Sequence, residues 1–193
     1  MDTEQKILEY IGRYVLLTDE EKASILPEVP YQTFEKGAHL LRQGEVARAC
    51  YFVVEGLVRQ YELRDGEEKT TYFYTEEEAI VAFESGARQV PCQFSWVCEE
   101  DTILVIGRLD RMEAAYAKNP KLEKMSGLFV GQNFGKYQDL ISTLITLNPE
   151  QRYRYLMEKR PTLINRVAQY HLASYLGIKP ETLSRIRRRI ARR

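Results

Sequence analysis

The sequence is poor in the residues that build covalent or metal-based frameworks. It has three cysteines, and none of them forms a Cys-x-x-Cys pair, which argues against a disulfide scaffold, a structural zinc site and a four-cysteine iron–sulfur cluster. Its two histidines, His39 and His171, lie far apart in the sequence and have no evident acidic partner. Hydrolase and nucleoside-triphosphate motifs are absent as well. We therefore predict no metal, haem or iron–sulfur cofactor and no enzymatic activity.

Long apolar runs are also missing. No stretch approaches about eighteen consecutive apolar residues, as a membrane-spanning helix would require, and the first residues lack the basic start and apolar core of a secretory signal. The composition is 44% hydrophobic and 29% charged, which suits a folded domain with a buried core. We therefore expect a soluble, cytoplasmic protein with no membrane partner.

Charge is unevenly distributed along a chain whose formal net charge is zero. Residues 151–193 hold twelve Lys and Arg against two acids, a net charge of +10. Residues 1–150 hold 16 bases against 26 acids and carry −10. This split predicts an acidic body joined to a C-terminal segment that binds a polyanion.

The first hundred residues change from a helical to a strand-like pattern. Residues 4–26 have apolar side chains spaced by three and four, which predicts helix. From about 31 to 107, short runs rich in Val, Ile, Tyr and Phe alternate with glycine or charged turns, which is typical of a sandwich or barrel-like roll. The runs 50–54 and 57–61 flank Glu55-Gly56, and this pattern predicts a β-hairpin.

The middle of the chain predicts a short helix over 110–118 and a longer one that ends before Asn148-Pro149. Two seven-residue series interleave on the longer helix, formed by Val130, Tyr137, Leu144 and by Asn133, Leu140, Leu147. This spacing is typical of a helix–helix seam, although the same stripe could pack against the strands of its own chain. Gly127, Gly131 and Gly135 also share one face, where each costs about 0.8–1 kcal/mol against alanine, so the close approach of another backbone would explain them.

The most informative pattern begins at Gln169. Counting this residue as position one, Ala173 stands at five, Gly177 at nine and Leu183 at fifteen. In a helix-turn-helix, position five must be small where the helices cross, and position nine wants glycine for a left-handed turn. Pro180 suits the first turn of the second helix. Apolar residues fill positions four, eight, ten and eighteen: Leu172, Leu176, Ile178 and Ile186.

Two segments resemble a known family. Lys36-Gly37, Gln43-Gly44-Glu45 and the run 51–59 resemble the start of a cyclic-nucleotide-binding β-roll, and 172–177 followed by 181–186 resembles the DNA-binding domain of Crp/Fnr transcription regulators. The resemblance implies an α+β fold: an antiparallel, jelly-roll-like β-roll (a double-stranded β-helix), a long central dimerisation helix, and a C-terminal helix-turn-helix without a full wing, since the sequence stops at Arg193. The expected domains are 1–118, 119–147 and 148–193.

The resemblance also implies partners and contacts. The second helix would enter the major groove of double-stranded DNA, where Glu181 would accept from a cytosine amine and Arg185 would donate to a guanine. Lys179 and Thr182 would contact phosphate, as would Arg188 and Arg189, because not all arginines of this helix can face DNA. Pro180 stands where relatives carry a base-reading arginine. The implied dimer interface consists of Val130, Asn133, Tyr137, Leu140 and Leu144.

The ligand site departs from the family pattern. Relatives hold a cyclic phosphate with a Gly-Glu-Leu segment that opens a helix, and with an arginine some residues later. Here the glutamate position falls on Ala79 and the arginine position near Pro91-Cys92-Gln93. We therefore expect no cyclic AMP bound in the usual way. The candidate residues for another ligand are Ile80, Phe83, Arg88, Gln93, Tyr137 and Gln138, and Tyr137 could serve either the seam or the pocket.

The sequence thus predicts a homodimeric transcription regulator that binds a pseudo-palindromic operator. Its effector is an unidentified small molecule, or none if the β-roll is only a scaffold. RNA polymerase is a further partner that the resemblance implies. The alternative is a small-molecule-binding β-roll signalling module whose DNA binding is weak or lost.

Overall fold

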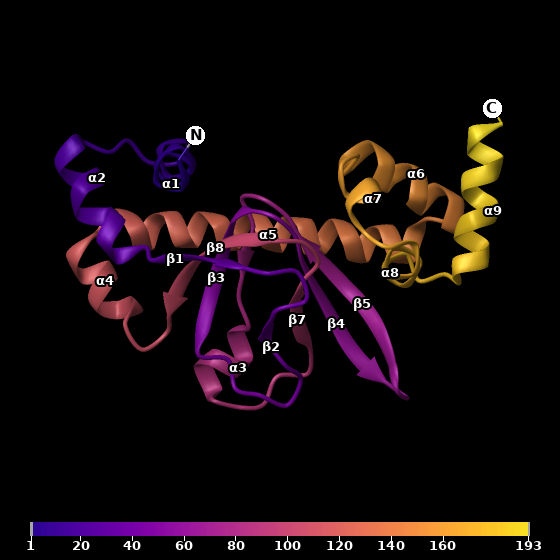
Figure 1. Cartoon of the computed structure of the whole chain (residues 1–193), viewed down its shortest axis with the longest axis horizontal. Coiled ribbons are helices and arrows are strands. Elements are labelled where there is room, and N and C mark those ends of the chain that lie inside the picture. The colour runs from indigo at the N-terminus through magenta and orange to yellow at the C-terminus, as the bar shows by residue number, and fades with distance from the viewer. Residues whose placement is uncertain (1, 193) are drawn as a thin grey trace. The chain divides into compact units, whose positions relative to one another are not determined.

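The computed structural model describes residues 2–192 and divides them into two compact units (Figure 1). The first unit takes in the chain up to Gln60 together with Phe73–Phe134, and the second takes in Tyr61–Tyr72 together with the chain from Gly135 on. The expected domain borders at 118/119 and 147/148 coincide with helix ends, whereas the division between the compact units falls inside the long helix.

The N-terminal segment is two helices and not one. α1 (Thr3–Gly12) begins where the side chain of Asp2 accepts from the N–H of Thr3 at 2.7 Å. α2 (Asp19–Ile25) begins at a capping box between Thr18 and Glu21, and the short 3-10 turn η1 (Leu26–Glu28) follows. Thr18 lies within the range 4–26 that was predicted to be helical. Its capping box with Glu21 begins a second helix inside that range.

The strands form two four-stranded sheets. One sheet has the order β1-β8-β3-β6 and the other the order β2-β7-β4-β5. In the first, β1 pairs antiparallel with β8 so that Tyr31 lies opposite Val105, and β3 pairs antiparallel with β8 so that Phe52 also lies opposite Val105. The bounds are β1 (Tyr31–Phe34), β2 (His39–Leu41), β3 (Ala49–Glu55), β4 (Val58–Arg64), β5 (Glu67–Tyr74), β6 (Ala79–Ile80), β7 (Ser95–Cys98) and β8 (Thr102–Arg108).

The hairpin predicted at Glu55-Gly56 is wrong, because β3 and β4 belong to different sheets. Gly56 has φ +110°, and a Cβ there would lie 2.5 Å from Oγ1 of the buried Thr102. The glycine is needed for this crossing between sheets rather than for a tight hairpin. The hairpin is instead β4–β5, which turns at Asp65-Gly66 with φ values of 53° and 79°, as a type I′ turn requires.

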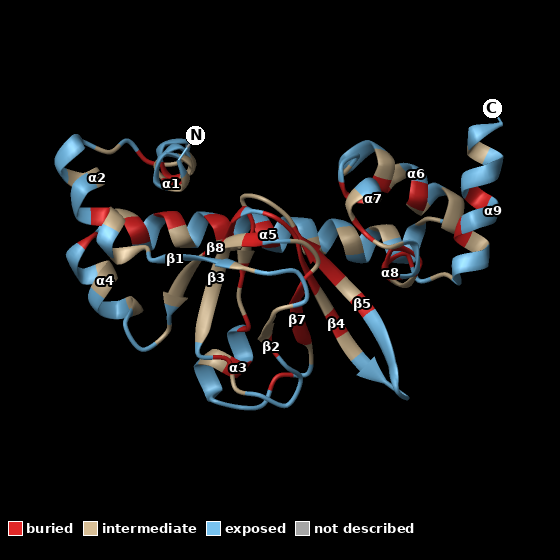
Figure 2. Ribbon diagram, in the orientation of Figure 1, coloured by how far each residue is buried: buried red, intermediate tan, exposed pale blue. Residues whose placement is uncertain are grey.

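One apolar core of the first unit joins helices to the strands of the first sheet. It contains Ile7 and Ile11 of α1, Val54 of β3 and Phe129 of the long helix. The rings of Phe52 and Phe129 lie 4.5 Å apart. Segments that are far apart in the sequence therefore meet on one side of this sheet, where α1 and α5 carry buried residues (Figure 2).

The helices of the middle segment follow the prediction closely. α4 (Met112–Lys118) ends at Asn119, and α5 (Pro120–Thr146) runs as one continuous helix of 27 residues (Figure 1). A proline opens α5, where its missing N–H is not needed. Between β6 and β7 lies a further short helix, α3 (Phe83–Arg88).

The C-terminal part is helical. α6 (Pro149–Lys159) begins at a capping box between Asn148 and Gln151. It is followed by α7 (Leu163–Arg166), α8 (Gln169–Tyr175) and α9 (Pro180–Ala191). The predicted absence of a wing concerns the chain from Arg193 on, which lies outside the described residues.

Candidate functional site

α8 and α9 are joined by a turn of defined hydrogen bonding. Gly177 has φ +65°, and its N–H donates to Ser174 O at 2.9 Å. The N–H of Ile178 donates to Ala173 O at 3.0 Å, which completes a Schellman motif. The glycine predicted at position nine therefore has the left-handed conformation that this position requires.

The two helices pack through the apolar positions that the sequence identified. Leu172 and Ala173 of α8 are fully buried, and Leu183 and Ile186 of α9 are nearly so. Ala173 leaves room at the crossing because its side chain is a single methyl group. These contacts fix which face of α9 is buried against α8. They therefore also fix which side chains of α9 point outward.

The outward face of α9 is basic apart from one carboxylate. Residues spaced by four and three share a face of a helix, and the positions opposite Leu183 and Ile186 are exposed: Glu181, Arg185, Arg188 and Arg192. The structure thus brings together three of the predicted DNA-binding residues and adds Arg192, which was not among the predicted contacts. Its spacing of seven from Arg185 was the signal that could have identified it.

Three other predicted DNA contacts lie beside that face. Lys179 is the N-cap residue of α9, and Thr182 is half-buried on its flank. Arg189 lies on the same flank and forms an ion pair with Glu150 at the start of α6. Glu150 also pairs with Arg154 at 2.9 Å, so one carboxylate holds two arginines.

The candidate ligand residues do not form a charged pocket. Ile80 is buried in β6, whereas Phe83 and Gln93 are exposed. Arg88, the base nearest to the expected phosphate position, lies on the surface and pairs with Glu84 at 3.1 Å. α3 begins at Phe83 with Ala82 as its N-cap residue, so Ala79 lies in β6 and not at the entrance of the helix.

Tyr137 and Gln138 belong to the second unit. The ring of Tyr137 lies 4.5 Å from the ring of Tyr72, and the guanidinium of Arg160 lies 5.6 Å from the centroid of the Tyr72 ring. Gln138 is exposed. Tyr137 therefore has an aromatic contact within its own chain.

Two of the predicted seam residues on α5 contact their own unit. Asn133 is buried, and its side-chain amide donates to the carbonyl of Ala79. Val130 faces an apolar cavity. Leu140 is half-buried, whereas Leu144 is exposed. A different face of α5 is open, with positions that alternate by four and three: Gly127, Gly131, Phe134, Gln138, Ile141 and Ile145.

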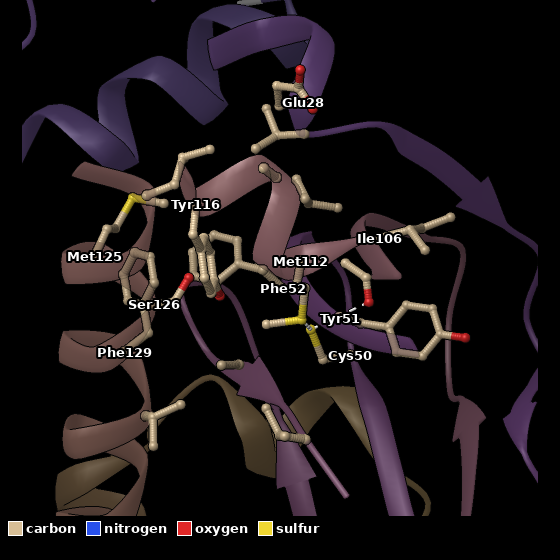
Figure 3. A pocket seen from close by; sticks show the side chains of 18 of the residues that line it. Glu28, Cys50, Tyr51, Phe52, Ile106, Met112, Tyr116, Met125, Ser126 and Phe129 are labelled. Carbon is tan, nitrogen blue, oxygen red and sulfur yellow. Dashed lines mark hydrogen bonds between the residues drawn. The ribbon is translucent and has the colours of Figure 1, made fainter. Parts of the chain in front are cut away.

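Hollows of different character lie within the described residues of the first unit. One is an apolar cavity of about 210 Å³ whose lining residues come from α1, β3, β8, α4 and α5 (Figure 3). The other is a more open hollow of about 460 Å³ near Leu40, Arg48, Tyr51 and Trp96.

The three cysteines are free thiols of low acidity. Burial raises the pKa of the Cys98 thiol to about 11. Burial also raises the pKa values of the Cys50 and Cys92 thiols. A thiol must lose its proton to react with an oxidant, so none of the three is activated.

Clusters of metal ligands and membrane-crossing helices are both absent from the part of the chain that the structure describes. Within residues 2–192, no group of three or more His, Cys, Asp and Glu side chains is placed to hold a metal ion. The described helices also include none that is long and apolar enough to cross a membrane.

Comparison with known proteins identifies the β-roll. No curated protein matches the sequence significantly. Residues 31–119 match the cyclic nucleotide-binding domain family. These residues extend from β1 to the end of α4, so the cyclic nucleotide-binding fold occupies most of the first unit and stops just before α5.

Solved structures share the fold of most of the chain. FixK2 from Bradyrhizobium japonicum is 20% identical, with a TM-score of 0.67 over 84% of each chain. The c-di-GMP responsive global regulator CLP from Xanthomonas campestris is 16% identical, with a TM-score of 0.69 over 90% of this chain and 92% of its own. TTHA1359, a CRP/FNR family transcriptional regulator from Thermus thermophilus, is 20% identical, with a TM-score of 0.66 over 84% of this chain and 86% of its own.

The resemblance to Crp/Fnr regulators is thus confirmed by the fold. The predicted α+β architecture of a β-roll, a long helix and C-terminal helices is confirmed as well. Two of these proteins, CLP and TTHA1359, are regulators by name.

Proposed function

We propose that the chain is a cytoplasmic, sequence-specific DNA-binding transcription regulator of the Crp/Fnr type. The observation that carries this proposal is the outward face of α9, where Arg185, Arg188 and Arg192 are exposed beside Glu181 on a helix anchored by the Gly177 turn. A helix of this kind fits the major groove, and its N-terminal half reaches base edges. The chain acts by binding and not by catalysis.

Each side chain has a role that its chemistry suits. Arg185 donates to O6 and N7 of guanine, and Glu181 accepts from the N4 amine of cytosine. Lys179 and Thr182, at the start of α9, contact phosphate, and Arg188 and Arg192 extend this contact toward the end of the helix. Arg189 reaches phosphate only when it leaves Glu150.

We further propose a homodimer that binds a pseudo-palindromic operator. The interface is the open face of α5, because Phe134, Ile141 and Ile145 are exposed large apolar residues at heptad spacing, and Leu144 lies beside them. Such a stripe needs an apolar partner. Val130 and Asn133, which the sequence placed in this seam, serve the packing of their own unit instead.

The sensor does not use cyclic AMP in the usual way. A cyclic phosphate needs an arginine partner and backbone donors, whereas Arg88 pairs with Glu84 on the surface, and Ala79, the position expected for the glutamate, lies in β6. The effector of the proposed regulator is therefore another small molecule, or the β-roll is only a scaffold. Contact with RNA polymerase stays a prediction.

A binding selection from random duplex DNA tests the proposal. It is run with and without cyclic AMP on the wild type, on Arg185→Ala and on Arg187→Ala, whose side chain lies off the outward face. We expect the wild type to enrich one pseudo-palindromic site equally under both conditions. Arg185→Ala should lose about 1–3 kcal/mol of binding and relax one base pair in each half-site, while Arg187→Ala should keep the wild-type site.

Three other results would each contradict a part of the proposal. Uniform weakening of Arg185→Ala on every sequence would assign Arg185 to phosphate alone. Enrichment only with cyclic AMP would overturn our interpretation of the sensor. A failure to enrich any site would favour a small-molecule-binding signalling module without DNA binding.

A further inference from the structure

The cavity of about 210 Å³ lies wholly within the first unit. Figure 3 shows Met125, Ser126 and Phe129 of α5 on one side, with Cys50, Tyr51 and Met112 on the other. The cavity is distinct from the hollow near Arg48 and Trp96, because the two share only Tyr51.

The lining offers apolar surface and no free charge. It contains no Lys, Arg or His. Its polar groups already have partners within the chain: the Tyr10 hydroxyl donates to Val54 O at 3.2 Å, and the Cys50 thiol donates to Gly107 O at 3.4 Å. Glu28, at the rim, pairs with Lys118 at 2.8 Å. An anion such as a cyclic phosphate would therefore be buried without a counter-charge, which is strongly unfavourable.

Rings and thioethers form much of the wall. The rings of Phe52 and Phe129 lie 4.5 Å apart at an angle of 38°, and Tyr10 packs edge-on against Phe52 at 6.0 Å. Met112 and Met125 add two polarizable sulfur atoms. Aromatic faces and thioethers both make favourable contacts with an aromatic guest.

The volume sets the size of the guest. An apolar cavity of about 150 Å³ lined by aliphatic and aromatic side chains stays dry and binds benzene. By proportion, the cavity described here accepts a molecule of about eight to ten non-hydrogen atoms. An empty apolar cavity is destabilising in proportion to its volume, so a guest that fills it stabilises the unit.

We propose that this cavity is a binding site for a small, neutral aromatic molecule of one ring or two fused rings. The site goes beyond the proposed function, because its occupancy can be measured without DNA. A guest in it contacts α4 and the first half of α5 directly, through Ala115, Met125 and Phe129.

Fluorine NMR tests the proposal on the full chain with two probes of the same size. 5-Fluoroindole is neutral, and 4-fluorobenzoate carries a negative charge. We expect saturable binding of 5-fluoroindole and no binding of 4-fluorobenzoate at the same concentrations. Equal binding of both probes, or no saturable binding of 5-fluoroindole, would overturn the proposal.

Two neighbouring alanines of α4 provide matched variants. Ala115 lines the cavity, whereas Ala114 is exposed. Ala115→Leu fills the space and should weaken 5-fluoroindole binding at least about tenfold, while Ala114→Leu should change it by less than about twofold. Binding that is equally tight in both variants would place the guest elsewhere and refute the site.

Methyl spectra of the wild type give a result that does not depend on any variant. Met112 and Met125 line the cavity, and Met157 lies in α6. With 13C-methyl methionine, 5-fluoroindole should shift the Met112 and Met125 signals by ring current and leave Met157 unchanged. Shifts confined to other methionines would contradict the proposal.

Discussion

The backbone N–H of Thr70 in β5 donates to the side-chain hydroxyl of Ser174 in α8 across 2.9 Å. Thr70 is buried, and Ser174 lies within the helix-turn-helix, one residue after the small Ala173. Residues Tyr61–Tyr72 of the β4–β5 hairpin, which include its turn, thus belong to the same compact unit as the C-terminal helices. The Ser174 hydroxyl, on the first helix of the motif, accepts a hydrogen bond from the backbone of a strand and is not among the proposed DNA contacts.

Replacing Ser174 by alanine should therefore destabilise the second unit. The substitution leaves the buried N–H of Thr70 without an acceptor, which costs about 1–3 kcal/mol. We expect the free energy of unfolding in urea to fall by this amount, and the Thr70 amide to exchange faster with solvent. Ser142→Ala, on an exposed position of α5, is the control and should change stability by less than about 0.5 kcal/mol. Equal stability of Ser174→Ala and the wild type would show that water replaces the hydroxyl.

Gly177→Ala should also be destabilising. A left-handed backbone costs a residue with a Cβ roughly 1–2 kcal/mol, and the added Cβ would lie 3.3 Å from Nη1 of Arg152. Thermal unfolding measures the effect. Gly12→Ala in α1 is the control: it has no positive φ and nothing within 4 Å of an added Cβ, so its stability should stay equal or rise. A Gly177→Ala variant as stable as the wild type would mean that the turn adopts another conformation.

Gly131→Ala separates the chain's own stability from its self-association. An added Cβ meets nothing within 4 Å in the single chain, so the substitution should stabilise the helix by about 0.8–1 kcal/mol. In the proposed dimer, the same methyl group would separate two closely approaching helices. Sedimentation equilibrium should show weaker dimerisation for Gly131→Ala and unchanged dimerisation for Gly12→Ala. Tighter or unaltered association would move the dimer interface away from this face.

Stability should depend on the Cys98 thiol at alkaline pH. Burial raises its pKa from 9.0 to about 11 in the folded protein, so the folded chain keeps a proton that the unfolded chain has already released. This contribution is complete below about pH 9 and is lost as the pH rises through about 11. We expect the free energy of unfolding to fall more steeply between these values in the wild type than in Cys98→Ala. Parallel slopes would show that the thiol is not shielded.

The sequence predicted best where a backbone conformation or a local spacing decides the structure. Gly177 and Ala173 identified the helix-turn-helix because only a glycine suits the turn and only a small side chain suits the crossing. The boundaries of α4 and α5 followed from Pro120 and from Asn148-Pro149. In each case the cause lies within a few residues of its effect.

Predictions failed where a residue's partner is distant in the sequence. The local pattern predicts a hairpin at Gly56, but the contact that excludes a side chain at this glycine comes from Thr102 on another strand. The predicted seam on α5 stays a prediction, but Val130 and Asn133 contact their own unit, because heptad spacing alone cannot tell which side of a helix its own sheet covers. The apolar cavity needs Ile7, Phe52 and Phe129 to meet, and no local pattern reveals this.

Glu150 changes how the basic tail responds to salt. Because it pairs with Arg154 and Arg189, phosphates in the proposed DNA complex would have to displace a carboxylate, rather than only mobile counterions, before these arginines could contact them. Each phosphate contact that releases condensed cations makes the fall of log affinity with log salt steeper by about 0.9. Exchange of one bound anion for another makes this fall steeper by less. In the proposed complex, the release of ions on binding is therefore set by Lys179 and the arginines on the outward face of α9, and not by all twelve basic residues that the tail carries.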